Sequence, residues 1–324
     1  MFQAMAAWRW YNFIESQVPA GKSILRINLD ETSLPLRPKS LRGHVFARNN
    51  EKLGERVSKH EQRACFTHVA MVCDDAEAQK LLPQYVVGNE MLLPARRMHE
   101  LLACAPRNVV LVRQRSSWNN FELCCKIVQA LGIALAPLAS SRQPVLFMDA
   151  CKIHTTRLVL DACRLAGIWV IIIPSRTTAK LQPLDTHVFA SYKARLAAGY
   201  RRFRSESQDE KIEIKRFLDC VYKAMQDSFE AKCWDAAFSA NGFGENQCKL
   251  SKSLRESLPS QAGEDTAPHR PAMQDLQLCF ARRAAVPIDL LMWPFPMKQS
   301  GSNIAATAST QPEKERSAFT APDC

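Results

Sequence analysis

Hydrophobic and polar residues follow one another in patterns that predict both strands and helices. Residues 24–30 alternate between apolar and polar side chains, the period of a strand with one polar face that carries Asp30. Residues 145–148 and 168–173 are near-continuous apolar runs, typical of strands covered on both faces. Residues 155–166 between them have a helical pattern, so the three segments together predict a right-handed parallel crossover.

Shorter patterns extend this prediction to the rest of the chain. Further strands are predicted at 43–46, 65–73, 85–87 and 109–112, so we expect the first third of the chain to form a meander. Helices are predicted at 1–16, 94–104, 118–131 and 184–204, and through 211–258. After Pro259 the periodicity fades and the content of Ser, Pro, Ala, Gln and Thr rises, which indicates a largely disordered tail.

Composition and charge narrow the classes of protein. The chain has 324 residues, 47% of them hydrophobic, which is enough to bury the core of one large domain with appendages. A net charge of +11 favours a polyanionic partner, either nucleic acid or an anionic membrane. The longest apolar run, 168–173, is far shorter than the roughly 20 residues that span a bilayer. No secretory signal is evident and the twelve cysteines have no regular spacing, so we expect an intracellular protein with reduced thiols.

Three aspartates lie at the ends of predicted strands or at the start of a predicted helix, where catalytic acids are often found. Asp30 ends the run LRINLD, Asp149 ends VLFMD, and Asp185 follows Pro183 at the predicted start of a helix. This order of elements matches a ribonuclease H-like core, an α/β fold with a mixed sheet of about five strands flanked by helices. Carboxylates gathered at adjacent strand ends repel one another unless a cation lies between them, and hard oxygen ligands suit Mg²⁺ or Mn²⁺. Two such ions support an in-line phosphodiester displacement without a covalent nucleophile.

Several motifs in order resemble the integrase-like DDE transposases, in particular their mariner and pogo-type branch. The three acids lie in LRINLDETS, in VLFMDACKIH, and in the third motif GIWVIIIPSRTTAKLQPLDTHVFASYKARL, which is the most specific. Thirty-five residues separate Asp149 from Asp185, a spacing within the range of this family. SSWNNFEL, which contains Trp118, and CWDAAFSANGF are also similar to segments of the family. The resemblance covers roughly residues 8 to 258.

The resemblance implies a metal-dependent enzyme that cuts and joins DNA. Asp30, Asp149 and Asp185 would be its catalytic residues and would ligate two Mg²⁺ or Mn²⁺ ions, and the partner would be a duplex with terminal inverted repeats. The resemblance implies no small-molecule cofactor and no membrane partner. It also implies a nuclear location if the source is eukaryotic, and a homodimer is one possible assembly. Only 29 residues precede Asp30, so we expect the usual N-terminal helix-turn-helix region to be lacking, which argues against autonomous transposition.

These patterns divide the chain into four segments. We expect a helix and linker at 1–22, the ribonuclease H-like catalytic domain at 23–200, a helical extension at 201–258 and the tail at 259–324. The expected DNA-contacting residues are one aromatic and six basic or potentially basic side chains: Trp118, Lys152, His154, Lys180, Lys193, Arg201 and Arg202.

Competing interpretations remain open at several positions. A solvated basic face explains the charge excess over 193–216 as well as a phosphate track does. His154 fits a packing or capping role as well as one beside DNA or metal. Cys151 and His154 form a C-x-x-H pair, but no second pair at a suitable spacing makes a zinc site. For the whole chain, the alternative is a non-enzymatic nucleic-acid-binding protein derived from a transposase. ATPase, serine hydrolase and zincin motifs are missing from the sequence.

Overall fold

The structure is a computed structural model that describes residues 2–36, 65–206, 213–230, 232–244 and 250–257. The strand predicted at 43–46 and the tail predicted at 259–324 lie outside the described residues.

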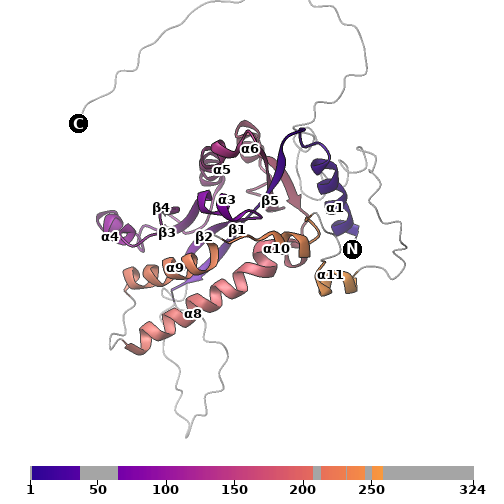
Figure 1. Cartoon of the computed structure of the whole chain (residues 1–324). Coiled ribbons are helices and arrows are strands. Elements are labelled where there is room, and N and C mark those ends of the chain that lie inside the picture. Colours follow the sequence, from indigo (N-terminus) through magenta and orange to yellow (C-terminus); the bar gives the residue numbers. More distant parts are fainter. Residues whose placement is uncertain (1, 37–64, 207–212, 231, 245–249, 258–324) are drawn as a thin grey trace, which may run out of the picture.

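A mixed six-stranded sheet with strand order β4-β3-β2-β1-β5-β6 forms the centre of the fold (Figure 1). Its strands are β1 (Ser23–Pro35), β2 (Cys65–Cys73), β3 (Gln84–Asn89), β4 (Val109–Gln114), β5 (Arg142–Asp149) and β6 (Trp169–Ile173). Strands β1, β2 and β3 form the expected antiparallel meander. The pairs β3–β4, β1–β5 and β5–β6 are parallel. The sheet therefore has one strand more than the five or so expected, because β4 pairs with β3 at the edge.

Strand β1 is longer and more buried than its pattern indicated. It continues past Asp30 because its outer half pairs with β2 as far as Pro35 opposite Cys65, whereas its pairing with β5 ends at Asn28 opposite Phe147. Its polar face is also covered, since Arg26, Asn28 and Asp30 are all buried. The alternating pattern gave the correct secondary structure but not the burial of the polar side chains.

Helices cover both faces of the sheet. α5 (Phe121–Leu135) and α6 (Arg157–Leu165) lie on one side, and α8 (Phe189–Glu206), α9 (Ile214–Phe229) and α10 (Asp235–Ala240) lie on the other (Figure 1). α6 joins β5 to β6 as the predicted crossover, and Gly167 follows it with a φ of 69°. The remaining short helices and turns are α3 (Ala76–Leu81), η1 (Ala95–Arg97), α4 (Met98–Leu102), η2 (Ala136–Leu138), α7 (Thr178–Leu181) and α11 (Lys252–Ser257).

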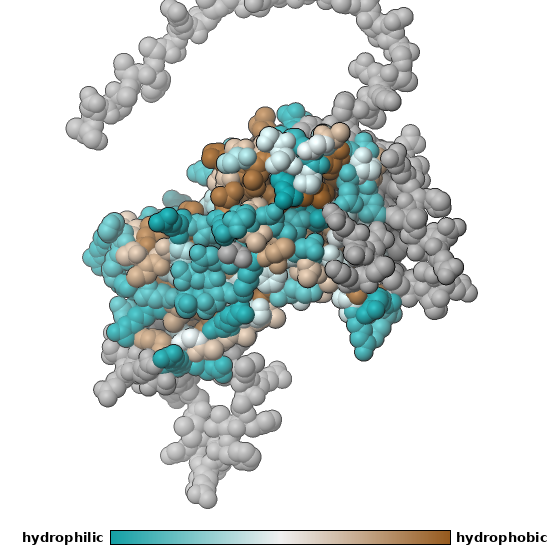
Figure 2. Space-filling view, in the orientation of Figure 1, coloured by the Kyte–Doolittle hydropathy of each residue, from teal (hydrophilic) through white to brown (hydrophobic). Residues whose placement is uncertain are grey.

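The surface over α5 and α6 carries several exposed apolar side chains. Figure 2 shows hydrophobic side chains gathered over these helices, and the exposed ones include Ile133, Leu158 and Leu165. Within the described part of the chain, Phe121–Leu138 is the one helical segment long and apolar enough to cross a membrane by length and composition. In the fold one side of α5 packs into the hydrophobic core, which is the position of a core helix in a globular domain.

The N-terminal helix α1 (Phe2–Glu15) is attached to the sheet by a buried ionic network. The guanidinium of Arg26, on β1, donates to Asp74 Oδ2 at 2.7 Å, to the Tyr11 hydroxyl at 2.6 Å and to Glu15 Oε1 at 3.1 Å. Because Tyr11 and Glu15 belong to α1 and Asp74 follows β2, one side chain ties three elements together.

Candidate active site

Two of the three aspartates lie at the same edge of the sheet because of the register of two parallel strands. The last paired residues of β1 and β5 are Asn28 and Phe147, so Asp30 and Asp149 each lie two residues further along. β5 ends at Asp149, while Asp30 remains within β1 and is only 9% exposed. The carboxylate of Asp30 accepts a hydrogen bond from the Glu31 amide at 2.8 Å.

Asp185 comes to this edge from the segment that follows β6. It lies in a π-helical turn, η3 (Leu184–Val188), that leads into α8, rather than in the first turn of an α-helix as expected. The buried Asn28 side chain positions this turn, because its Oδ1 accepts from the Leu184 amide at 2.8 Å and its Nδ2 donates to the Phe147 carbonyl at 3.0 Å. A single amide therefore links β1, β5 and η3, the three elements that carry the acids.

The three carboxylates lie close enough to influence one another's ionisation. Burial, together with the negative charges of Asp185, Glu31 and Asp149, raises the pKa of Asp30 to about 8. Burial and the charge of Asp149 also raise the pKa of Asp185, while Lys193 acts in the opposite direction. Such a cluster of oxygen donors, mutually repelling and partly buried, is chemically suited to hold divalent Mg²⁺ or Mn²⁺.

His154 lies between two acids and fixes one of the candidate ligands. Its Nδ1 lies 2.6 Å from Asp149 Oδ1, and its Nε2 lies 3.3 Å from Glu31 Oε1. Burial alone would lower the pKa of His154, but the bonds to Asp149, Cys151 and Glu31 raise it well above its ordinary value. Burial likewise opposes ionisation of Asp149 and Glu31, yet the contact with His154 keeps the pKa of each below its usual range.

Three residues of this site were not singled out from the sequence. Glu31 follows Asp30 in LRINLDETS, and Asn119 donates to its Oε1 at 2.6 Å. Asn119 follows Trp118 in the loop before α5, and Asn28 belonged only to a strand pattern. The only sequence signal for these residues was a polar side chain in or beside an apolar segment. Such a signal identifies a site residue only when the segment that it contacts in the fold is known.

The expected DNA-contacting residues fall into four groups. Lys193 lies near Asp185 and is 5.9 Å from the centre of the Phe189 ring. Lys152, Lys180 and the 66%-exposed Trp118 are on the surface of segments that adjoin the acidic site in sequence or in space: Trp118 precedes Asn119, Lys152 follows Asp149, and Lys180 precedes η3.

The other three expected DNA-contacting residues do not lie on the surface beside the acids. Arg201 and Arg202 are exposed on α8, at least eight residues beyond Lys193, which is about 12 Å along a helix. The imidazole of His154 is fully buried and faces Asp149 and Glu31 rather than solvent.

The strand order, the antiparallel meander followed by parallel strands, and the acids at the β1–β5 edge define a ribonuclease H-like α/β protein. A family model described as DDE superfamily endonuclease matches residues 67–238, more than half of the chain. The chain therefore belongs to the DDE superfamily of endonucleases. The matched residues include Asp149 and Asp185 and begin after Asp30.

Solved structures similar to this chain include those of Mos1 transposase. A Mos1 paired-end complex with left transposon end is 13% identical with a TM-score of 0.37, over 76% of this chain and 64% of that chain. The catalytic domain of Mos1 mariner transposase is 12% identical with a TM-score of 0.35, over 74% and 94% of the two chains. The chain thus spans about 64% of the length of the transposase in the paired-end complex. Comparison with curated proteins gave no match.

Proposed function

We propose that this chain is a DDE-type transposase domain that cleaves and joins DNA with the help of Mg²⁺ or Mn²⁺. Asp30, Asp149 and Asp185 would hold two ions. The observation that carries the proposal is the electrostatic coupling of these acids, which come from three distant segments of a chain in the DDE superfamily of endonucleases. Burial and mutual repulsion raise the pKa of Asp30 and Asp185, so the proximity of these carboxylates opposes folding unless a cation binds between them.

The chemistry divides between the metal ions and the side chains around them. When bound, two ions would activate a water or 3′-hydroxyl and stabilise the leaving oxygen of an in-line displacement. His154 would keep Asp149 ionised and oriented, because its Nδ1 contacts one carboxylate oxygen and leaves the other available. Asn28 would hold Asp185 at the sheet edge through the Leu184 amide. Lys193, next to Asp185, would meet a DNA phosphate.

DNA is the proposed partner, and residues 23–200 are proposed as the catalytic domain. The segment 201–258 would extend it, with Arg201 and Arg202 on α8 following the phosphate backbone. Residues 1–22 would form the N-terminal helix and linker. Action on genomic DNA would place the protein inside the cell, in the nucleus of a eukaryotic source.

The alternative, a non-enzymatic DNA-binding descendant of a transposase, is less well supported. Loss of one aspartate is enough to abolish metal chemistry, yet all three acids remain and a buried asparagine and histidine still orient them. This alternative would be favoured by DNA binding with a steep salt dependence and no metal-dependent cleavage.

The proposal is tested by nicking of supercoiled DNA in the presence of Mn²⁺. Nicking is expected from the wild type and from Asp219→Asn, which changes an exposed acid of α9 paired with Lys215. Asp149→Asn should abolish nicking while its circular dichroism spectrum stays that of the wild type. Equal nicking by Asp149→Asn would reject the assignment of the catalytic acids.

A further inference from the structure

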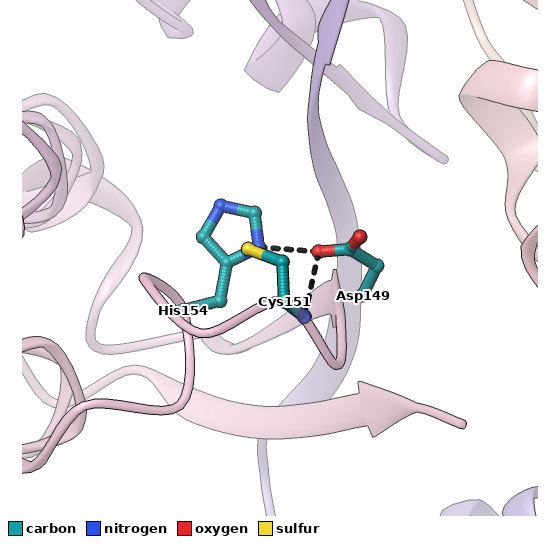
Figure 3. A group of neighbouring side chains, drawn as sticks. All are labelled: Asp149, Cys151 and His154. Atoms are coloured by element: carbon teal, nitrogen blue, oxygen red, sulfur yellow. Dashed lines mark hydrogen bonds and ion pairs between the residues drawn. The ribbon is translucent and has the colours of Figure 1, made fainter. Parts of the chain in front are cut away.

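A second kind of metal-binding group overlaps the acidic site. One carboxylate oxygen of Asp149, the thiol sulfur of Cys151 and a ring nitrogen of His154 all lie within 4.8 Å of one another. Figure 3 shows the three side chains gathered around the turn that follows β5, with the Cys151 sulfur beside the imidazole. Sequence spacing supplied only the Cys151 and His154 pair; the fold adds a carboxylate as the third donor.

The turn that carries these donors is held in place by its own hydrogen bonds. The Cys151 amide donates to Asp149 Oδ1 at 3.3 Å, and the Cys151 carbonyl accepts from the Thr155 hydroxyl at 3.0 Å. The Thr156 hydroxyl donates to the Ile153 carbonyl at 3.0 Å. The donors therefore sit on a rigid turn, which limits the entropy lost when a ligand is bound.

The Nε2 side of His154 matches the usual surroundings of a metal-bound histidine, and zinc would replace the proton that Nδ1 shares with Asp149. Such a histidine offers one nitrogen to the metal and bonds the other to a carboxylate that fixes the ring. Here Nδ1 faces Asp149 and Cys151 while Nε2 faces Glu31, and Glu31 is fixed in turn by Asn119. Asp149 and Cys151 are partly exposed, so an ion has a route to the donors from solvent.

The donor atoms select a soft or borderline cation. Thiolate and imidazole suit Zn²⁺, whereas Mg²⁺ takes oxygen ligands. Tetrahedral zinc has bonds of about 2.0–2.3 Å and holds its ligand atoms roughly 3–4 Å apart. Atoms that already lie within 4.8 Å of one another need only small side-chain shifts to reach that geometry.

We propose that Asp149, Cys151 and His154 form a three-ligand site for Zn²⁺ that competes with the hard metal ions for Asp149. A fourth position stays open to water, as in zinc sites with three protein ligands. Zinc at this site withdraws Asp149 from Asp30 and Asp185 and, if the proposed function holds, opposes activation by magnesium. The site goes beyond the proposed function and shares Asp149 and His154 with it.

The test uses Co²⁺ as a spectroscopic probe on the reduced full-length protein. The wild type should develop a sulfur-to-cobalt charge-transfer band, and one equivalent of Zn²⁺ should remove it. Cys104→Ser, which changes an exposed cysteine outside the group, should behave as the wild type. Cys151→Ser should lose the band and bind Zn²⁺ at least tenfold more weakly, since loss of even an outer partner of a metal ligand costs about 10–100-fold.

Two results would overturn the zinc site: no charge-transfer band in the wild type, or a band that persists unchanged in Cys151→Ser. Neither result bears on the proposed function, because Cys151→Ser keeps all three aspartates and should bind Mn²⁺ as the wild type does. Conversely, a cobalt band that depends on Cys151 in a protein that never nicks DNA would keep the zinc site and remove the transposase assignment.

Discussion

At the scale of single residues, the site depends on buried polar side chains that each connect two or three segments. Asn28 and His154 are both fully buried, and each bonds to at least one group more than 100 residues away in sequence. The sequence located Asp30, Asp149 and Asp185, because acids at the ends of apolar runs are visible in one segment. It could not locate the supporting contacts, because an inward-facing Asn or Glu has no distinctive local pattern.

Asn28→Ala tests whether this amide positions the site. The change leaves the Leu184 amide and the Phe147 carbonyl without their partner, so we expect a loss of about 1–3 kcal/mol in unfolding free energy. Mn²⁺ affinity should also fall, because η3 is no longer held against β1. Urea unfolding and calorimetry measure the two effects. Lost stability with unchanged Mn²⁺ affinity would make Asn28 a purely structural residue.

His68 gives the fold a defined sensitivity to acid. Burial lowers the pKa of this histidine to about 4, although its bond to Gln84 acts in the opposite direction. The unfolded chain, with an ordinary pKa near 6.5, binds the proton first, so stability present above about pH 6.5 is lost as the pH falls towards 4. The full loss is of the order of 3 kcal/mol.

The measurement is urea unfolding of the wild type and of His68→Gln at pH 7 and pH 4.5. The wild type should lose more stability between the two pH values than His68→Gln, because only the wild type has this buried imidazole to protonate. Equal losses in the two proteins would show that other groups cause the acid sensitivity.

At the scale of elements, most of the helices and strands follow from local pattern, but their boundaries and surroundings depend on contacts between segments. The patterns of apolar and polar residues predicted β1, β5, β6 and the crossover helix α6. They did not predict that β1 continues to Pro35, because that extension exists only through pairing with β2. They also predicted an α-helical start where Asp185 lies in the π-helical turn η3. The hydrogen bond from the Leu184 amide of this turn to Asn28 is a tertiary contact, which a local pattern cannot reveal.

Arg26→Met tests how firmly α1 is attached to the sheet. Methionine keeps much of the buried volume but leaves Asp74 without its cation, and an unpaired buried charge costs roughly 3–5 kcal/mol. The matched control is Arg97→Met, which breaks a solvent-exposed pair with Glu100 and should cost much less, because water screens that pair. Chemical denaturation compares the variants. Equal, small effects would mean that the network around Arg26 does not stabilise α1.

At the scale of the whole molecule, the fold gathers into one place residues that the sequence spreads over 155 positions, from Asp30 to Asp185. Sequence order and strand patterns were sufficient for the ribonuclease H-like class, because the meander and the crossover constrain which strands pair. Net charge favoured a polyanion without separating nucleic acid from membrane, and membership of the DDE superfamily of endonucleases favours DNA. The overlap of oxygen donors with a thiol and an imidazole at Asp149 becomes visible only at this scale.

The central claim is that the three aspartates form one divalent-metal site, and titration with Mn²⁺ by calorimetry tests it without knowledge of the DNA target. The account predicts that the wild type and Asp219→Asn bind Mn²⁺ and that binding by Asp149→Asn is weakened at least tenfold, with all three proteins folded. Binding of equal strength in Asp149→Asn, or none in the folded wild type even with DNA present, would contradict the account.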